Sequence, residues 1–407
     1  MCLYSYLAHP HSMTSPLVRV ADRMAHVSYP IRDIVLQARK IEARGTPMHW
    51  FNIGDPNRFD FAPPAWVTQA IHAALDDPQY SGYAPSEGDP QLRAAVAQSE
   101  GLSPERIFIS NGLSEGLSFT LQALMDPGDD VLLPSPNYPL YASLSRVLGG
   151  VENLYQCDEN WQPDVEDMRK KITKRTRAIV VISPNNPTGA VYPRKTLQAI
   201  VDLAGEHKIP VVADEIYDQL LLDPSASPGP VHKLAQDVPV IRGCGLSKNF
   251  FYPGARVGWL ALHGPGLDGF AGALQRLCNA RLSVNWEMQR GAIAAVQHAP
   301  DHLPAALAKL RKRRDLISRR LNEIEGIRTT VPQAAFYIFP QVTDGPWKTD
   351  AEFVYDLMEQ TGIVGVPGSG FSSQLPGLFL RLVYLSKEDE LAAAMDKLEG
   401  FMKKRLK

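Results

Sequence analysis

The feature that most constrains this chain is a regular alternation of short apolar runs with segments of helical spacing. The runs, rich in valine and isoleucine, span residues 130–133, 177–182, 210–213, 238–241 and 257–262. Leu197, Ile200, Val201 and Ala204 recur at the spacing of one helix face between two of them. Near-continuous β-branched runs predict strands that are buried on both faces of a parallel sheet. We therefore expect an α/β fold whose mainly parallel sheet is sandwiched by helices.

The last third of the chain has a different pattern. A single apolar stripe predicts a long amphipathic helix that ends at Gly326, and a mixture of short strands and helices follows it. The stripe consists of Leu303, Leu307, Leu310, Ile317, Leu321 and Ile324. A basic run, 311–314, punctuates this stripe, and we interpret it as the solvated face of the helix. This part is expected to be a smaller α+β domain.

Composition excludes several function classes. The formal charge of −2 in 407 residues argues against nucleic acid or an anionic membrane as a partner. Cys2, Cys157, Cys244 and Cys278 lie far apart, without the spacing of a metal site, and predict reduced thiols in a cytoplasmic protein. The apolar start of the chain is too short to span a bilayer, and residues 1–24 are expected to be disordered or extraneous.

The stretch 245–258 follows one apolar run and precedes another, which places Lys248 at the end of a strand. An amine in that position can form a Schiff base with a carbonyl group. Ser247 and Arg256 could then steady an aldehyde cofactor that has an anionic tail. A solvated surface pair is the alternative interpretation of Ser247 and Lys248.

Polar groups follow three other predicted strands. A turn at Gly112 leads into a helix near Ser114, whose free amides could bind phosphate, although an ordinary capped helix would look the same. Asn186 belongs to a Ser-Pro-Asn-Asn-Pro-Thr-Gly turn, and Asp214 precedes Tyr217 by three residues. Each of these is also compatible with a turn or a cap. Together with Lys248 and Arg256 they match the needs of a pyridine-aldehyde cofactor.

These motifs, in this order, resemble the fold-type-I pyridoxal-phosphate-dependent aminotransferases of class I/II, and the resemblance extends over residues 29–385. It implies a large cofactor domain, 57–295, and a smaller α+β domain built from both chain ends, 25–56 and 296–407. It also implies a homodimer, because Tyr83 matches a tyrosine that reaches the phosphate of the neighbouring subunit.

The resemblance assigns a role to each matching residue. Lys248 would bind pyridoxal 5'-phosphate covalently, Asp214 would pair with its ring nitrogen, and Tyr217 and Asn186 would contact its phenolate oxygen. Arg381 and Gly54 would bind the substrate α-carboxylate. The remaining matches are the phosphate contacts Leu113, Ser114, Ser247 and Arg256, and Tyr138 stacked on the ring.

Within this family the chain looks most similar to the bacterial alanine aminotransferase branch, through Tyr-Pro-Ile-Arg at 29–32 and the segments 51–56, 184–192 and 281–285. Arg32 would bind the distal carboxylate of glutamate. Asp33, Trp286, Glu287 and the aromatic segment 250–253 depart from that branch, which leaves aromatic, branched-chain or methionine-like substrates open. A pyridoxal-phosphate lyase acting on C–S or other β bonds would share every cofactor residue. A transcription regulator would need a DNA-binding module in addition.

Overall fold

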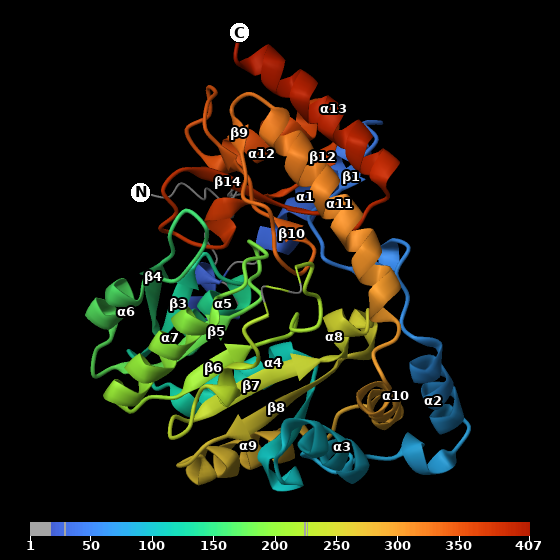
Figure 1. Ribbon diagram of the computed structural model, residues 1–407, viewed down its shortest axis with the longest axis vertical. Coiled ribbons are helices and arrows are strands. Elements are labelled where there is room, and N and C mark those ends of the chain that lie inside the picture. The colour runs from blue at the N-terminus through green and yellow to red at the C-terminus, as the bar shows by residue number, and fades with distance from the viewer. Residues whose placement is uncertain (1–17, 28–29, 224, 226) are drawn as a thin grey trace.

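The computed structural model describes residues 18–27, 30–223, 225 and 227–407 (Figure 1). Within them, the large sheet has seven strands in the order β2-β8-β7-β6-β5-β3-β4. Neighbouring pairs among β3 to β7 are parallel, and β8 runs antiparallel to both β2 and β7. The strands are β2 Ile107–Asn111, β3 Asp130–Ser135, β4 Val151–Gln156, β5 Thr176–Ile182, β6 Val211–Asp214, β7 Val240–Gly245 and β8 Val257–His263. The mainly parallel α/β sheet expected from the sequence is confirmed.

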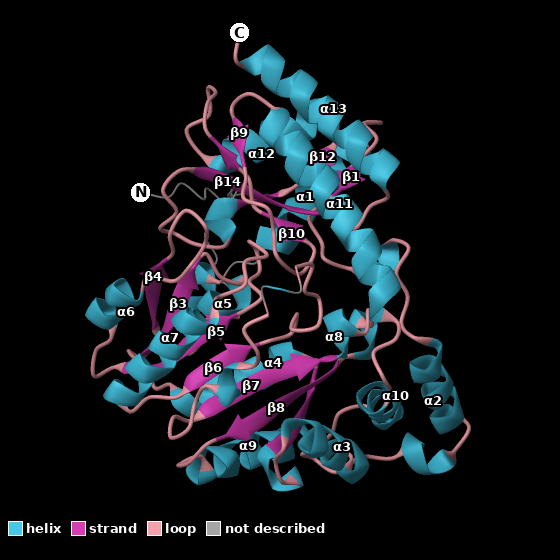
Figure 2. Ribbon diagram, viewed as in Figure 1, coloured by secondary structure: helices cyan, strands magenta, loops and turns pink. Residues whose placement is uncertain are grey.

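Alternate residues of the central strands enter two different apolar clusters. In β5, Val180 and Ile182 pack with α4 Leu113–Leu124, whereas Ile179 and Val181 pack with α7 Arg194–His207. Successive side chains of a strand point to opposite faces, so valine and isoleucine at every position bury both faces of the sheet. Helices therefore cover both sides, as Figure 2 shows. The other helices of this part are α2 Ala65–Leu75, α3 Pro90–Glu100, α5 Pro139–Val147, α6 Val165–Lys171, α8 Leu246–Asn249, α9 Asp268–Arg281 and α10 Trp286–Gln297.

The smaller part joins the two ends of the described chain. Strand β1 His49–Trp50 pairs in parallel with β12 Ile363–Val364, and the N-terminal α1 lies among the C-terminal elements (Figure 1). Strand β14 Leu378–Val383 pairs with β10, β11 and β13. The remaining elements are α1 Pro30–Glu42, β9 Ile327–Arg328, β10 Tyr337–Ile338, β11 Gln341–Val342, β13 Val366–Pro367, α11 Leu303–Glu323, α12 Asp350–Thr361 and α13 Glu388–Arg405.

The sequence predicted that the basic run 311–314 forms the solvated face of this helix, but one of its residues is buried. Arg313 is buried, and its Nη1 and Nη2 donate to the Asp60 carboxylate at 2.8 and 2.9 Å. This pair lowers the pKa of Asp60 to about 2. The stripe itself is confirmed, since Leu310, Ile317 and the other predicted residues pack into the core. Spacing along one helix could not reveal Asp60, because this partner lies far away in the sequence.

The segment that carries Tyr217 lies outside regular helix and strand. A hydrogen-bonded turn rather than a helix follows Asp214, with Asp218 N donating to Glu215 O at 3.0 Å.

No described helix is both long and apolar enough to cross a membrane. Residues 1–17 and Tyr29, which belong to the expected N-terminal segment and to the Tyr-Pro-Ile-Arg motif, lie outside the described residues.

Gly258 provides a test of this packing. A Cβ there would lie 2.4 Å from the Leu113 amide nitrogen, so β8 and the start of α4 approach more closely than a side chain permits. We expect Gly258→Ala to lower the free energy of unfolding by about 1–3 kcal/mol. Gly400→Ala is the matched control, because a Cβ at this position of α13 would meet nothing within 4 Å. The control should be neutral or stabilising by about 0.5–1 kcal/mol. Thermal unfolding of both variants checks this, and equal melting temperatures would contradict the packing.

Candidate active site

A cavity of about 470 Å³ lies at the carboxyl ends of the central strands and extends to residues of the smaller part. It brings together nearly all of the site residues predicted from the sequence. Those in its wall are Arg32, Gly54, Leu113, Ser114, Tyr138, Asn186, Asp214, Tyr217, Ser247, Lys248, Arg256 and Arg381. Tyr83 is outside this cavity and is 79% exposed, which leaves its ring available on the surface.

Lys248 reaches the cavity from α8, which begins directly after β7. Its Nζ donates a hydrogen bond of 2.8 Å to the Gly54 carbonyl and lies 5.5 Å from the centre of the Phe336 ring. Burial, with smaller effects of the Arg381 and Arg256 charges, lowers the pKa of Lys248 to about 8. With this pKa, roughly a tenth of the amine is neutral, and nucleophilic, at pH 7, far more than for a solvated lysine with a pKa near 10.4.

Asp214 ends β6 on the face of the sheet that faces the cavity. Its Oδ2 accepts a hydrogen bond of 3.1 Å from the Tyr141 hydroxyl, and its Oδ1 accepts one of 3.3 Å from the Ile216 amide. Burial outweighs both hydrogen bonds and raises the pKa of Asp214 to about 6. A cationic partner in the cavity would favour the charged form of this carboxyl group.

Two hydrogen-bonding side chains lie nearby. The hydroxyl oxygens of Tyr217 and Tyr337 are 2.7 Å apart, and burial raises the pKa of Tyr217 well above its ordinary value, so this phenol stays protonated. Asn186 follows β5 in the cavity wall, where its Oδ1 accepts from Arg381 at 3.0 Å. Both residues offer donors to an oxygen of a bound molecule.

The part of the cavity wall formed by the start of α4 and Arg256 is suited to an anion. Gly112, at φ 70°, turns the chain from β2 into α4 without a side-chain cap, and the first two helical residues, Leu113 and Ser114, line the cavity, so this helix start can supply amides to an anion. The backbone of Gly112, at φ 70° and ψ 161°, lies in a region that essentially only glycine adopts, which explains the need for glycine here. Because α4 begins at Leu113, Ser114 lies inside the helix, and the interpretation of Ser114 as an ordinary cap is wrong.

Arg381 brings a guanidinium from β14 of the smaller part to the cavity. The residue is 1% exposed, and Nη2 donates to the Asn52 carbonyl while Nη1 donates to Asn186. The guanidinium carbon lies 4.7 Å from the Tyr337 ring centre and 4.8 Å from that of Phe371. Aromatic rings on the guanidinium fix its plane, which suits the bidentate binding of a carboxylate.

Several residues of the site were missed by the sequence analysis. Tyr141 holds Asp214, Tyr337 holds Tyr217, and the Asn52 carbonyl holds Arg381. Tyr141 and Tyr337 lie 73 and 120 residues from their partners, and no local motif marks them. Asp55 and Arg58 also line the cavity, and the Gly-Asp-Pro turn at 54–56 was the available signal for the former.

The departures from the alanine branch lie mostly outside the cavity wall of their own chain. Trp286 donates from Nε1 to Asp89 at 2.7 Å and packs edge-on against Tyr80, and Phe250 stacks on His302. Within segment 250–253 only Pro253 lines the cavity. Of these departures, Pro253 is the one that lines the cavity of its own chain.

Comparison with known proteins gives one consistent result. The family model for aminotransferase class I and II matches residues 46–398. The alanine aminotransferase of Mycobacterium tuberculosis is 38% identical over 396 residues, which cover 93% of this chain and 91% of that protein. The glutamate-pyruvate aminotransferase AlaA of Escherichia coli K12 is 34% identical over 404 residues, covering 95% and 98%.

Solved structures agree. The alanine aminotransferase of Pyrococcus furiosus superimposes with a TM-score of 0.92 at 43% identity, covering 95% of this chain and 100% of that one. An aspartate aminotransferase of Thermus thermophilus gives 0.85 at 29% identity, covering 94% and 100%. With the cavity at the strand ends and a match over most of its length, the chain belongs to the class I and II aminotransferases.

Proposed function

We propose that the cavity binds pyridoxal 5'-phosphate. Aminotransferases of this class generally depend on it, and its three chemical parts have partners in the wall. The phosphate fits the α4 amides, Ser114, Ser247 and Arg256, the aldehyde fits the neutral amine of Lys248, and the ring nitrogen fits Asp214. The volume of about 470 Å³ falls in the range of small-molecule sites. When bound, this group supplies an electron sink for the carbanion formed at the substrate Cα.

The side chains then have distinct tasks. Arg381 binds the substrate α-carboxylate through its two Nη groups, beside the Gly54 backbone. Lys248 Nζ, in its neutral form, would take the proton from the substrate Cα and deliver it to the carbon of the cofactor's aldehyde group. Asp214 stays charged and stabilises a positive ring nitrogen, while Tyr217 and Asn186 orient the adjacent ring oxygen and Tyr138 stacks on the ring face. The convergence of Lys248, Asp214 and Arg381 on one cavity is the observation that supports this proposal.

We further propose L-alanine and L-glutamate as amino donors, with pyruvate and 2-oxoglutarate as acceptors. The names of the relatives in Mycobacterium tuberculosis and Escherichia coli K12 support this pair. Arg32, exposed at the cavity wall, is the candidate for the distal carboxylate of glutamate. Tyr83, exposed and away from its own cavity, fits a homodimer in which it reaches the partner's site. The free thiols Cys157, Cys244 and Cys278 support a cytoplasmic location.

A half-reaction screen tests the substrate assignment. The purified holoenzyme is mixed with each of the twenty amino acids, without an acceptor, and the visible absorbance of its cofactor is followed. Alanine and glutamate should convert the cofactor fastest and release their 2-oxo acids in stoichiometric amount. Faster conversion by an aromatic, branched-chain or sulfur amino acid would replace the proposed pair. Release of ammonia or a thiol would assign the enzyme to the lyases.

Removal of the amine tests the role of Lys248. Lys248→Ala should abolish turnover while the protein remains folded, because no other group in the proposed site takes over transfer of the Cα proton. Activity and melting temperature are measured on the same sample, with Lys312→Ala, in the exposed part of α11, as control. Persistent transamination by Lys248→Ala would refute the assignment.

The lowered pKa of Lys248 predicts a pH dependence in the protein without cofactor. The amine is protonated and unreactive below its pKa of about 8 and becomes nucleophilic as the pH rises through this value. Reductive methylation of Lys248, followed by peptide mass spectrometry, should therefore show a midpoint near pH 8. Solvated lysine amines titrate near 10.4. A midpoint above pH 10 would show that burial does not favour the neutral amine.

The role of Arg32 can be tested by comparing substrates that have a distal carboxylate with substrates that lack one. Arg32→Gln should raise KM for glutamate and 2-oxoglutarate about tenfold, equivalent to about 1.4 kcal/mol, because the distal carboxylate loses its cation. Alanine and pyruvate have no such carboxylate, so their KM values should change by less than about twofold. Steady-state kinetics with both substrate pairs measure this. Equal effects on the two pairs would remove Arg32 from substrate recognition.

A further inference from the structure

Behind the candidate active site lies a buried ion cluster that the reaction itself does not use. At its centre is Arg242 of β7, which is 7% exposed and forms ion pairs with Glu100, Glu215 and Asp218. Nε of Arg242 donates to Glu215 at 2.5 Å, while Nη1 and Nη2 donate to Glu100 and Asp218. One guanidinium therefore ties together the end of α3 and the segment after β6.

Strand register separates this cluster from the cavity. Arg242 pairs with Ala213, and its neighbour Gly243 pairs with Asp214. Because successive side chains alternate between the two faces, Asp214 points into the cavity while Arg242 points to the opposite face. The sheet thus carries a cofactor-facing carboxylate on one side and an ion cluster on the other.

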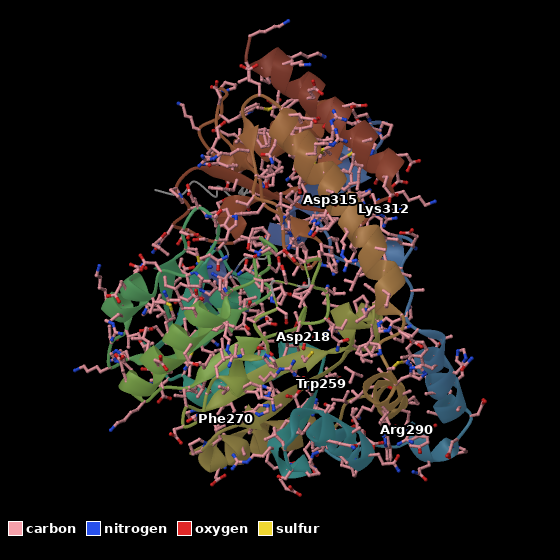
Figure 3. The ribbon with its side chains drawn as sticks, in the orientation of Figure 1. Asp218, Trp259, Phe270, Arg290, Lys312 and Asp315 are labelled. Carbon is pink, nitrogen blue, oxygen red and sulfur yellow. The ribbon has the colours of Figure 1, made fainter. Side chains whose placement is uncertain are left out.

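The cluster is adjacent in sequence to each proposed catalytic group. Glu215 follows Asp214, and Asp218 follows Tyr217. Asp218 Oδ1 also accepts a hydrogen bond of 2.6 Å from Nδ2 of Asn249, the residue after Lys248. Figure 3 labels Asp218 near the carboxyl ends of β6 and β7, where these segments meet. Asp218 is therefore the residue that links the turn carrying Tyr217 to the helix carrying Lys248.

Two histidines extend the cluster away from the cavity. His263 Nε2 lies 3.2 Å from Glu100 Oε2, and the His232 ring stacks on His263 at 3.8 Å with an interplanar angle of 9°. Parallel rings direct their in-plane lone pairs side by side rather than toward one point, so this arrangement does not form a metal site. Glu100 thus anchors the side of Arg242 that is remote from the active site.

We propose that Asp218, held by Arg242, is a positioning residue for the active site and fixes Tyr217 and Lys248 relative to each other. This inference rests on the proposed roles of those two residues. Loss of the Asp218 carboxylate leaves the turn 215–218 held to Arg242 by Glu215 alone, and it leaves Asn249 Nδ2 with the weak acceptor Cys244 Sγ at 3.7 Å. Both groups then move from their productive geometry. A displacement of about 1 Å at a catalytic group can lower a rate about 100-fold.

Glu100 offers a matched control because it bonds to the same guanidinium but has no neighbour in the site. In either Asp218→Ala or Glu100→Ala, Arg242 retains two carboxylate partners. The holoenzymes are compared in kcat, in KM, in the pH midpoint of the visible cofactor absorbance and in melting temperature. A merely structural role would move the melting temperature alone.

We expect Asp218→Ala to lower kcat at least about tenfold with KM within about twofold, and to shift the absorbance midpoint. Glu100→Ala should lower the melting temperature to a similar extent and keep kcat and the midpoint. Asp218→Asn, which retains an acceptor for Asn249, should restore part of kcat; if Asp218→Ala does not fold, this variant takes its place in the comparison with Glu100→Ala.

Unchanged kcat and midpoint in the Asp218 variants, or equal changes in the Glu100 variant, would overturn the inference. Failure of the proposed function is distinguishable, because the wild-type holoenzyme would then transfer no amino group. Measuring the absorbance midpoints and melting temperatures of the variants requires no turnover. These two measurements therefore test the positioning role of Asp218 even if the proposed reaction does not occur.

Discussion

Burial of two ionisable groups of opposite type at neighbouring strand ends is the constraint on which this site depends. Lys248 and Asp214 both lose water, and burial shifts each pKa toward neutrality, to about 8 and about 6. Neither shift would arise on an exposed loop, since water would stabilise the charged forms. The fold therefore creates reactivity by placing ordinary side chains where the sheet, its helices and the smaller part exclude solvent.

The architecture divides the necessary contacts between distant segments. The large sheet delivers Lys248 and Asp214, whereas β14 delivers Arg381, and the Asn52 carbonyl holds that guanidinium from near the start of the described fold. Because β1 pairs with β12, the two ends of the described chain must assemble before the side of the cavity that Arg381 lines exists. The seven-stranded sheet carries the residues on the other side of the cavity.

Much of this site was predictable because its chemistry is encoded next to strand ends. Ser247 and Lys248 after β7, Asp214 at the end of β6 and Asn186 after β5 lie where runs of valine and isoleucine stop. Parallel strands place those ends at one edge, so local patterns were sufficient to predict their convergence. The resemblance added Arg381 and Arg32, which no local pattern distinguishes from ordinary surface cations.

The parts that sequence could not predict depend on contacts across the fold. Strand β4 was missed because it lies at the sheet edge and mixes polar with apolar residues in no regular pattern. Helix α6 was missed because it is short and highly charged. Tyr141 and the buried Arg313 have partners far away in the sequence, Asp214 and Asp60. Spacing describes one element at a time, whereas these residues are defined by packing between elements.

The central claim is that the amine of residue 248 and the carboxylate of residue 214 meet around one aldehyde cofactor. Reduction of the holoenzyme with borohydride, followed by peptide mapping, tests it directly by fixing the cofactor to the amine that holds it. We predict a single labelled peptide that carries the phosphopyridoxyl mass on Lys248. A label on a different lysine, or no label on a protein that transfers amino groups, would contradict this interpretation of the site.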